Sequence, residues 1–167
     1  MSINTQPTAV NSALDRLAGA ATALACVALV GTAIVEAWQV FARYVLNDSP
    51  SWTEPLALLL MSTTMMLGAA VGVRGNRHFG FFILLESVPP GMQRVLRFMS
   101  SAIAAAIGLM FAGWGGQMLL DTWSYPMAGA PLPQGMVFAP MCIGGALIAL
   151  FSLERIVSPP PAVAAGD

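Results

Sequence analysis

The chain has 167 residues, of which 57% are hydrophobic and only 9% are charged, and its formal net charge is −1. A soluble domain carries about 25% charged residues, so these charges are too few to cover a surface that faces water. Lipid is therefore the expected solvent for most of the chain. The small net charge argues against a nucleic-acid partner, which would require a clustered basic face.

Four apolar segments follow one another along the chain, and each is long enough to cross about 30 Å of hydrocarbon at about 1.5 Å per residue. In lipid only helices and closed barrels satisfy the backbone, and these runs are too long and too little alternating for barrel strands. We expect an all-α integral membrane protein with a single membrane domain, residues 1–167. The expected transmembrane helices lie at about residues 17–44, 54–73, 94–120 and 134–155.

The connections between these helices differ in character. Residues 47–51 form a tight turn that leads into Trp52, a residue that suits a membrane interface. Residues 79–87 are apolar but too short to span, so we expect a short arm helix along the interface there. Residues 121–133 are rich in Pro and Gly, and the tail at 159–167 is expected to be disordered.

The arginines predict the orientation. Six of the seven lie before the first helix, between the second and third, or after the fourth, and only Arg43 lies between the first and second. The positive-inside rule then places both termini and the connection between the second and third helices in the cytoplasm. The turns at residues 47–51 and 121–133 are expected on the outer side.

Small residues recur at every fourth position on two of the helices. Such residues let helix backbones approach closely in lipid, where packing rather than hydrophobicity drives association. Packing within the chain and a surface for another membrane subunit are both open interpretations. The positions are Ala104, Gly108, Ala112 and Gly116 on the third helix, and Gly68 and Gly72 on the second.

Charged residues near the outer turn are the first candidates for a functional role. Glu36, Gln39 and Arg43 make a polar stripe near the outer end of the first helix. Glu54 opens the second helix, where a carboxylate favours the positive end of the helix dipole. We predict that Arg43 and Glu54 form an ion pair across the turn, with substrate or proton binding as the alternative role.

The remaining polar residues do not suggest catalysis. His78 is the only histidine and is interpreted as a structural loop residue, and Cys26 and Cys142 lie in apolar runs without metal-ligand spacing. Single acidic residues such as Asp121 and Glu154 are interpreted as solvated helix ends. The sequence has no nucleophile–base pair, carboxylate dyad or phosphate-binding loop, so we expect no enzyme, catalytic residue, metal or cofactor.

Several motifs, in order, resemble the small membrane subunit (Q-type, DctQ-like) of TRAP transporters, the tripartite ATP-independent periplasmic transporters of bacteria and archaea. The similarity covers roughly Leu17 to Ile156. One departure is Pro55, where the family often has a second Glu. Around the first turn, residues 43–47 are similar to the family's RY-x-x-N motif and residues 51–54 to its W-x-E motif. At the end of the second helix, residues 67–70 are similar to LGAA and residues 74–78 to R-x-x-x-H. At the start of the fourth helix, residues 133–135 are similar to P-x-G and residues 140–144 to P-x-x-x-G.

The resemblance implies a division of labour. In that family an extracytoplasmic binding protein captures the substrate, often a carboxylate, and a large membrane subunit moves it with sodium ions. This chain is then expected in the bacterial inner membrane, among lipids, as a scaffold for the large subunit, and help in docking the binding protein is open. Sodium is not expected to bind this chain. Structural or partner-contacting roles are implied for Arg43, Asn47, Trp52, Glu54, Arg74, His78 and Pro133.

Two other classes of membrane protein compete with this interpretation. An autonomous four-helix, proton-coupled exporter would use Glu36 as its carrier carboxylate, but Glu36 lies near the outer end of its helix rather than at mid-membrane. A membrane anchor for a redox enzyme would need more histidines to hold haem. Within the apolar runs only hydroxyls and amides occur, and such hydroxyls usually bond back to a helix. A partner is therefore expected to supply the transport site.

Overall fold

The computed structural model describes residues 9–75 and 90–157. Four helices in these ranges are long and apolar enough to cross a membrane, which confirms the all-α fold class. Three of the predicted features lie outside the described residues: the interfacial arm at 79–87, His78 and the tail at 159–167. The elements are α1 (Ala9–Tyr44), α2 (Thr53–Arg74), α4 (Pro90–Asp121), the short 3-10 helix η1 (Gln134–Phe138) and α5 (Ala139–Val157).

Two helices begin earlier than their apolar segments suggest. α1 starts at Ala9 and α4 at Pro90, whereas hydropathy places their starts at about 17 and 94. Backbone hydrogen bonding does not end where the side chains become polar, and proline is well suited to the first turn of a helix. Conversely, the expected fourth helix begins as the 3-10 turn η1 and becomes α-helical only at Ala139.

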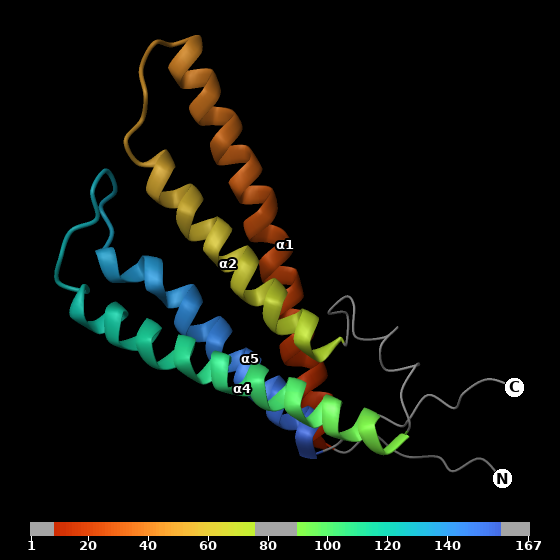
Figure 1. Ribbon diagram of the computed structural model, residues 1–167. Helices are drawn as coiled ribbons and strands as arrows, with labels where there is room; N and C mark the ends of the chain where they lie inside the picture. Colours follow the sequence, from red (N-terminus) through yellow and green to blue (C-terminus); the bar gives the residue numbers. More distant parts are fainter. Residues whose placement is uncertain (1–8, 76–89, 158–167) are drawn as a thin grey trace, which may run out of the picture.

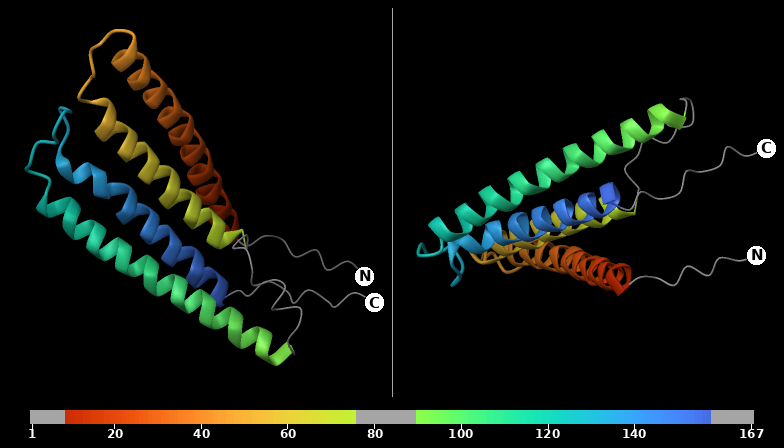
Figure 2. Two further views of the ribbon diagram at one scale, coloured as in Figure 1. Left: turned by 45° about the horizontal axis from the view of Figure 1, so that its top comes forward. Right: turned by 90° about the horizontal axis from the view of Figure 1, so that it is seen from below.

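The helices lie side by side in the order α1, α2, α5, α4 (Figures 1 and 2). The main helix contacts join α1 with α2, α2 with α5, and α5 with α4. The chain therefore forms an open layer with α5 and α2 in the middle and α1 and α4 at the edges. The edge helices expose large apolar side chains along their length, such as Val27 and Ile34 on α1 and Leu109 on α4.

Glycines bring α5 against both of its neighbours. A Cβ atom added to Gly145 would lie 2.6 Å from the backbone N of Ala112 on α4, and one added to Gly144 would lie 2.5 Å from Met66 Cβ on α2. A Cβ atom on Gly108 would in turn lie 2.6 Å from the N of Ala149. Two adjacent glycines thus let α5 contact one helix on each side at backbone distance.

The small-residue positions singled out by their spacing have different environments. Gly108 and Ala112 lie in the contact with α5, and a Cβ on Gly116 would be 3.6 Å from Cys142 Sγ. Ala104 and Gly72 are half-buried. Gly68 is exposed, with nothing within 4 Å of its added Cβ, so it makes no such contact within this chain.

One end of α1 extends beyond the start of α2, as three contacts between the two helices show. Asp15 of α1 forms an ion pair with Arg74 of α2, and the Thr64 hydroxyl of α2 lies 3.4 Å from the Ala25 carbonyl oxygen of α1. A Cβ atom added to Gly31 of α1 would contact Leu60 of α2. Continuing this antiparallel register puts Glu36 level with the first turn of α2. Figure 1 shows that α1 extends beyond α2 at this end. The part of α1 after Glu36, to Tyr44, is about 12 Å long.

Candidate functional site

Polar contacts gather at the two ends of the layer. We call the end that contains Arg74 and Arg155 the arginine end, and the end that contains residues 45–52 and 122–133 the turn end. Between them, the described threonines in the spans donate to helix carbonyls: Thr63 Oγ1 to Leu59 O at 2.7 Å and Thr64 Oγ1 to Leu60 O at 3.0 Å. The hydroxyls of these threonines are therefore used within the helices, as the sequence predicts.

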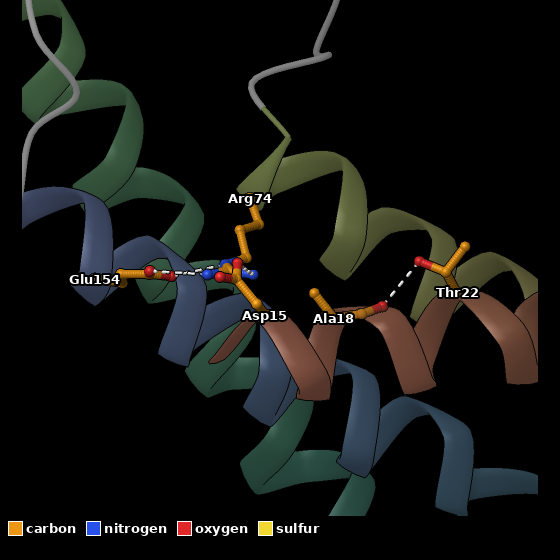
Figure 3. Close-up of polar contacts among 5 residues, drawn as sticks. All are labelled: Asp15, Ala18, Thr22, Arg74 and Glu154. Atoms are coloured by element: carbon orange, nitrogen blue, oxygen red, sulfur yellow. Dashed lines mark hydrogen bonds and ion pairs between the residues drawn. The ribbon is translucent and has the colours of Figure 1, made fainter. Parts of the chain in front are cut away.

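Arg74 is the centre of the arginine end (Figure 3). Its guanidinium makes a bidentate contact with Glu154 of α5, with Nε to Oε2 at 3.0 Å and Nη2 to Oε1 at 3.2 Å. Its Nη1 lies 2.8 Å from Asp15 Oδ1 of α1. One side chain at the end of α2 therefore links the three helices α1, α2 and α5.

The two ion pairs of Arg74 differ in shielding. The side chains of Arg74 and Glu154 are 18% and 20% exposed, while that of Asp15 is 67% exposed. The Arg74 guanidinium also lies 5.5 Å from the ring centroid of the fully buried Phe151, within cation–π range. The pair with Glu154 is therefore expected to carry most of the stabilisation, because water screens exposed ion pairs.

Arg155 makes a second contact between α5 and the end of α2. Its Nη1 donates a hydrogen bond of 2.8 Å to the Val73 carbonyl oxygen. That carbonyl is in the last turn of α2, where backbone oxygens have no helical partner. Successive residues of α5, Glu154 and Arg155, thus contact the side chain and the backbone at the end of α2.

At the turn end, the two connections between helices contact each other. Ser51 Oγ donates to the Gly129 carbonyl oxygen at 3.2 Å. Gly129 has a positive φ of 86°, and a Cβ there would overlap the Ser51 carbonyl oxygen, so both the conformation and the space require glycine. The second connection is closed on itself by Gln134 N to Tyr125 O at 2.8 Å and by a bridge between Pro126 and Pro133.

The predicted ion pair between Arg43 and Glu54 is not formed. Both residues are exposed, and the ion pairs found among residues 9–75 and 90–157 all involve Arg74. The reason is the register: Glu36, not Arg43, is level with Glu54, and Arg43 lies about 10 Å further along α1. Asn47 closes the turn after α1 with a positive φ of 56°, and Trp52 occupies the position before α2.

Sequence reasoning named Arg74 but missed its partners. Glu154 was predicted to be a solvated helix end, yet it is mostly buried and doubly bonded to Arg74. The available signal was charge: under the predicted topology, Asp15, Arg74 and Glu154 all lie at the same membrane surface. Within the described parts of the chain, no group of three or more His, Cys, Asp or Glu could hold a metal ion.

The fold and these contacts define a multi-pass helical membrane protein whose charged contacts brace the helix ends. Residues 32–159 match the profile of the family described as tripartite ATP-independent periplasmic transporters, DctQ component, and the chain belongs to this family. It is a transmembrane small permease of the TRAP type.

Individual relatives agree with this assignment. The chain is 28% identical over 121 residues to a putative TRAP transporter small permease protein of Haemophilus influenzae, with 71% of this chain and 74% of that protein covered. It is 22% identical over 86 residues to the C4-dicarboxylate TRAP transporter small permease protein DctQ of Vibrio cholerae, with 52% and 34% covered. It is 31% identical over 52 residues to the sialic acid TRAP transporter small permease protein SiaQ of the same species, with 31% and 30% covered.

Proposed function

We propose that this chain is a scaffold for the large membrane subunit of a sodium-driven TRAP transporter and does not itself bind the transported substrate. The observation that supports this role is the open layer, in which two edge helices leave large apolar surfaces uncovered. Neighbouring membrane helices of another subunit could cover such a surface. The bracing at both ends of the layer suits a rigid support.

A transport site is expected in the partner subunit. Alternating access needs a binding site near the midplane, usually with broken helices or polar groups. The described helices are continuous through their apolar spans, and their charged side chains lie towards the ends. Glu36, the carboxylate that a small exporter would need, is level with the first turn of α2 and therefore far from the middle of that helix.

The substrate is proposed to be a carboxylate that an extracytoplasmic binding protein delivers. Two relatives are named for C4-dicarboxylate and for sialic acid, both of which are acids. We propose that sodium drives the assembled complex without binding this chain.

Reconstitution into liposomes tests the scaffold role. We expect no sodium-driven carboxylate uptake by the purified chain alone. Uptake should appear when the large subunit and the loaded binding protein are added, and should be lost when this chain is omitted. Uptake or proton-coupled export by the chain alone would contradict the proposal and favour the small exporter.

We further propose that the arginine end faces the cytoplasm. The six-to-one distribution of arginines supports this orientation. Alkaline phosphatase fused after Gly75 is expected to be inactive and the same enzyme fused after Gly129 to be active, because it folds only outside the cytoplasm. Activity of the Gly75 fusion would reverse the topology.

A further inference from the structure

α4 continues beyond α5 at the arginine end. A Cβ on Gly115 would meet the backbone of Cys142, and a Cβ on Gly108 would meet that of Ala149, so α4 and α5 run antiparallel. Following this register, Val157 at the end of α5 lies beside α4 near residue 100. Residues 90–99 of α4 therefore extend past α5, which Figure 2 shows in both views.

The length of α4 places this extension at the level of lipid headgroups. From Asp121, where α4 ends, about 20 residues cross the hydrocarbon, which reaches as far as Ser101. Arg97 and Arg94 lie about 36 and 40 Å from Asp121 along the helix axis. A bilayer about 40–45 Å thick has roughly 5–7 Å of polar layer on each side of its hydrocarbon, so Arg97 falls in the headgroup layer and Arg94 at its aqueous edge, within reach of lipid phosphates through its long side chain.

The extension has an apolar side and a basic side. Met92, Val95 and Met99 follow the i, i+3, i+7 spacing of one helix side, and each is more than half exposed. Arg94 and Arg97 are three residues apart on another side, Arg94 exposed and Arg97 half-buried. Arg97 is three helical turns before Gly108, which contacts α5, so the basic side is the side of α4 that faces α5 and the apolar side faces away from it.

The carboxylates described at this end do not neutralise these two arginines. Asp15 and Glu154 both pair with Arg74. Arg97 is also close enough to Arg155 of α5 for their positive charges to repel. Among the residues that the structure describes, the arginine end thus carries an excess of positive charge.

We propose that Arg94 and Arg97 bind the phosphate of an anionic phospholipid at the arginine end of α4. The charge favours an anionic headgroup over a zwitterionic one. The depth of the two arginines, at the headgroup layer of a membrane that α4 is long enough to cross, favours a lipid phosphate over a soluble anion. This lipid site is independent of any transport partner.

Native mass spectrometry of the full-length chain in a neutral detergent tests the site. The chain is titrated with phosphatidylglycerol or with phosphatidylcholine of the same acyl chains. We expect preferential binding of phosphatidylglycerol, which weakens about 30-fold in R94Q/R97Q and about fivefold in R94Q alone. Phosphatidylcholine binding should not change, and added salt should weaken the preference.

Two matched variants and a competition with inorganic phosphate make the result decisive. R94K/R97K should keep the preference, because lysine also binds phosphate as a point charge. R43Q removes an exposed arginine from the turn end and should leave the preference intact. Equal phosphatidylglycerol binding by a helical, monodisperse R94Q/R97Q chain would overturn the proposal. Displacement of the lipid by an equal concentration of inorganic phosphate would also overturn it, in favour of a site for a free anion.

Discussion

Replacing Gly145 with leucine is expected to separate α4 from α5 and to prevent accumulation of the folded chain. Even a Cβ at this position would lie 2.6 Å from Ala112 N and 2.7 Å from the Gly108 carbonyl oxygen. Both atoms belong to the backbone of α4, so relief requires a shift of the whole helix rather than a new rotamer. Overpacking in a rigid contact typically costs about 1–3 kcal/mol, and a full leucine side chain against backbone should exceed this range.

The measurement is the yield of monodisperse chain in detergent, together with its thermal unfolding followed by circular dichroism. Gly68→Leu is the matched control, because nothing lies within 4 Å of a Cβ atom at Gly68. The control should give a wild-type yield and unfolding temperature for the chain alone. A wild-type yield of Gly145→Leu would show that α4 and α5 do not form this close contact.

Replacing Arg74 with leucine is expected to lower the free energy of unfolding by about 2–4 kcal/mol. The change leaves the Glu154 carboxylate, only 20% exposed, without its charged partner, and an unpaired charge in a partly dry site is costly. It also removes the cation–π contact with Phe151. The double change with Glu154→Leu should recover part of the loss, because neither charge is then left alone.

Asp15→Asn is the internal comparison for this experiment. Its contact with Arg74 is of similar length, but its side chain is 67% exposed, so the loss should stay within about 1 kcal/mol. The free energy of unfolding in detergent is measured for the wild type, Arg74→Leu, Glu154→Leu and the double variant, which together give a double-mutant cycle. Asp15→Asn is measured under the same conditions. A coupling near zero between these two residues, or a larger loss for Asp15 than for Glu154, would contradict the assigned order of the two ion pairs.

The four membrane helices follow from the amino-acid sequence alone, because length and apolarity are local properties and lipid forces the backbone to be helical. Short motifs such as those at residues 43–47 and 133–135 also indicated the family. The spacing of Gly108 and Ala112 marked the side of α4 that approaches α5, since only small residues permit that distance.

Which helices are neighbours, and how they are aligned, follows only from packing between distant parts of the chain. In lipid, buried and lipid-facing positions are both apolar, so the periodicity of hydrophobic residues does not identify the packed side of a helix, and a small-residue stripe does not name the helix that packs on it. Packing between distant segments sets the helix order α1, α2, α5, α4. It also brings Glu154 to Arg74 as its main partner, although the two residues are 80 positions apart in the sequence. The register of α1 on α2 likewise set Arg43 beyond Glu54 and so prevented the ion pair that their closeness in sequence suggested.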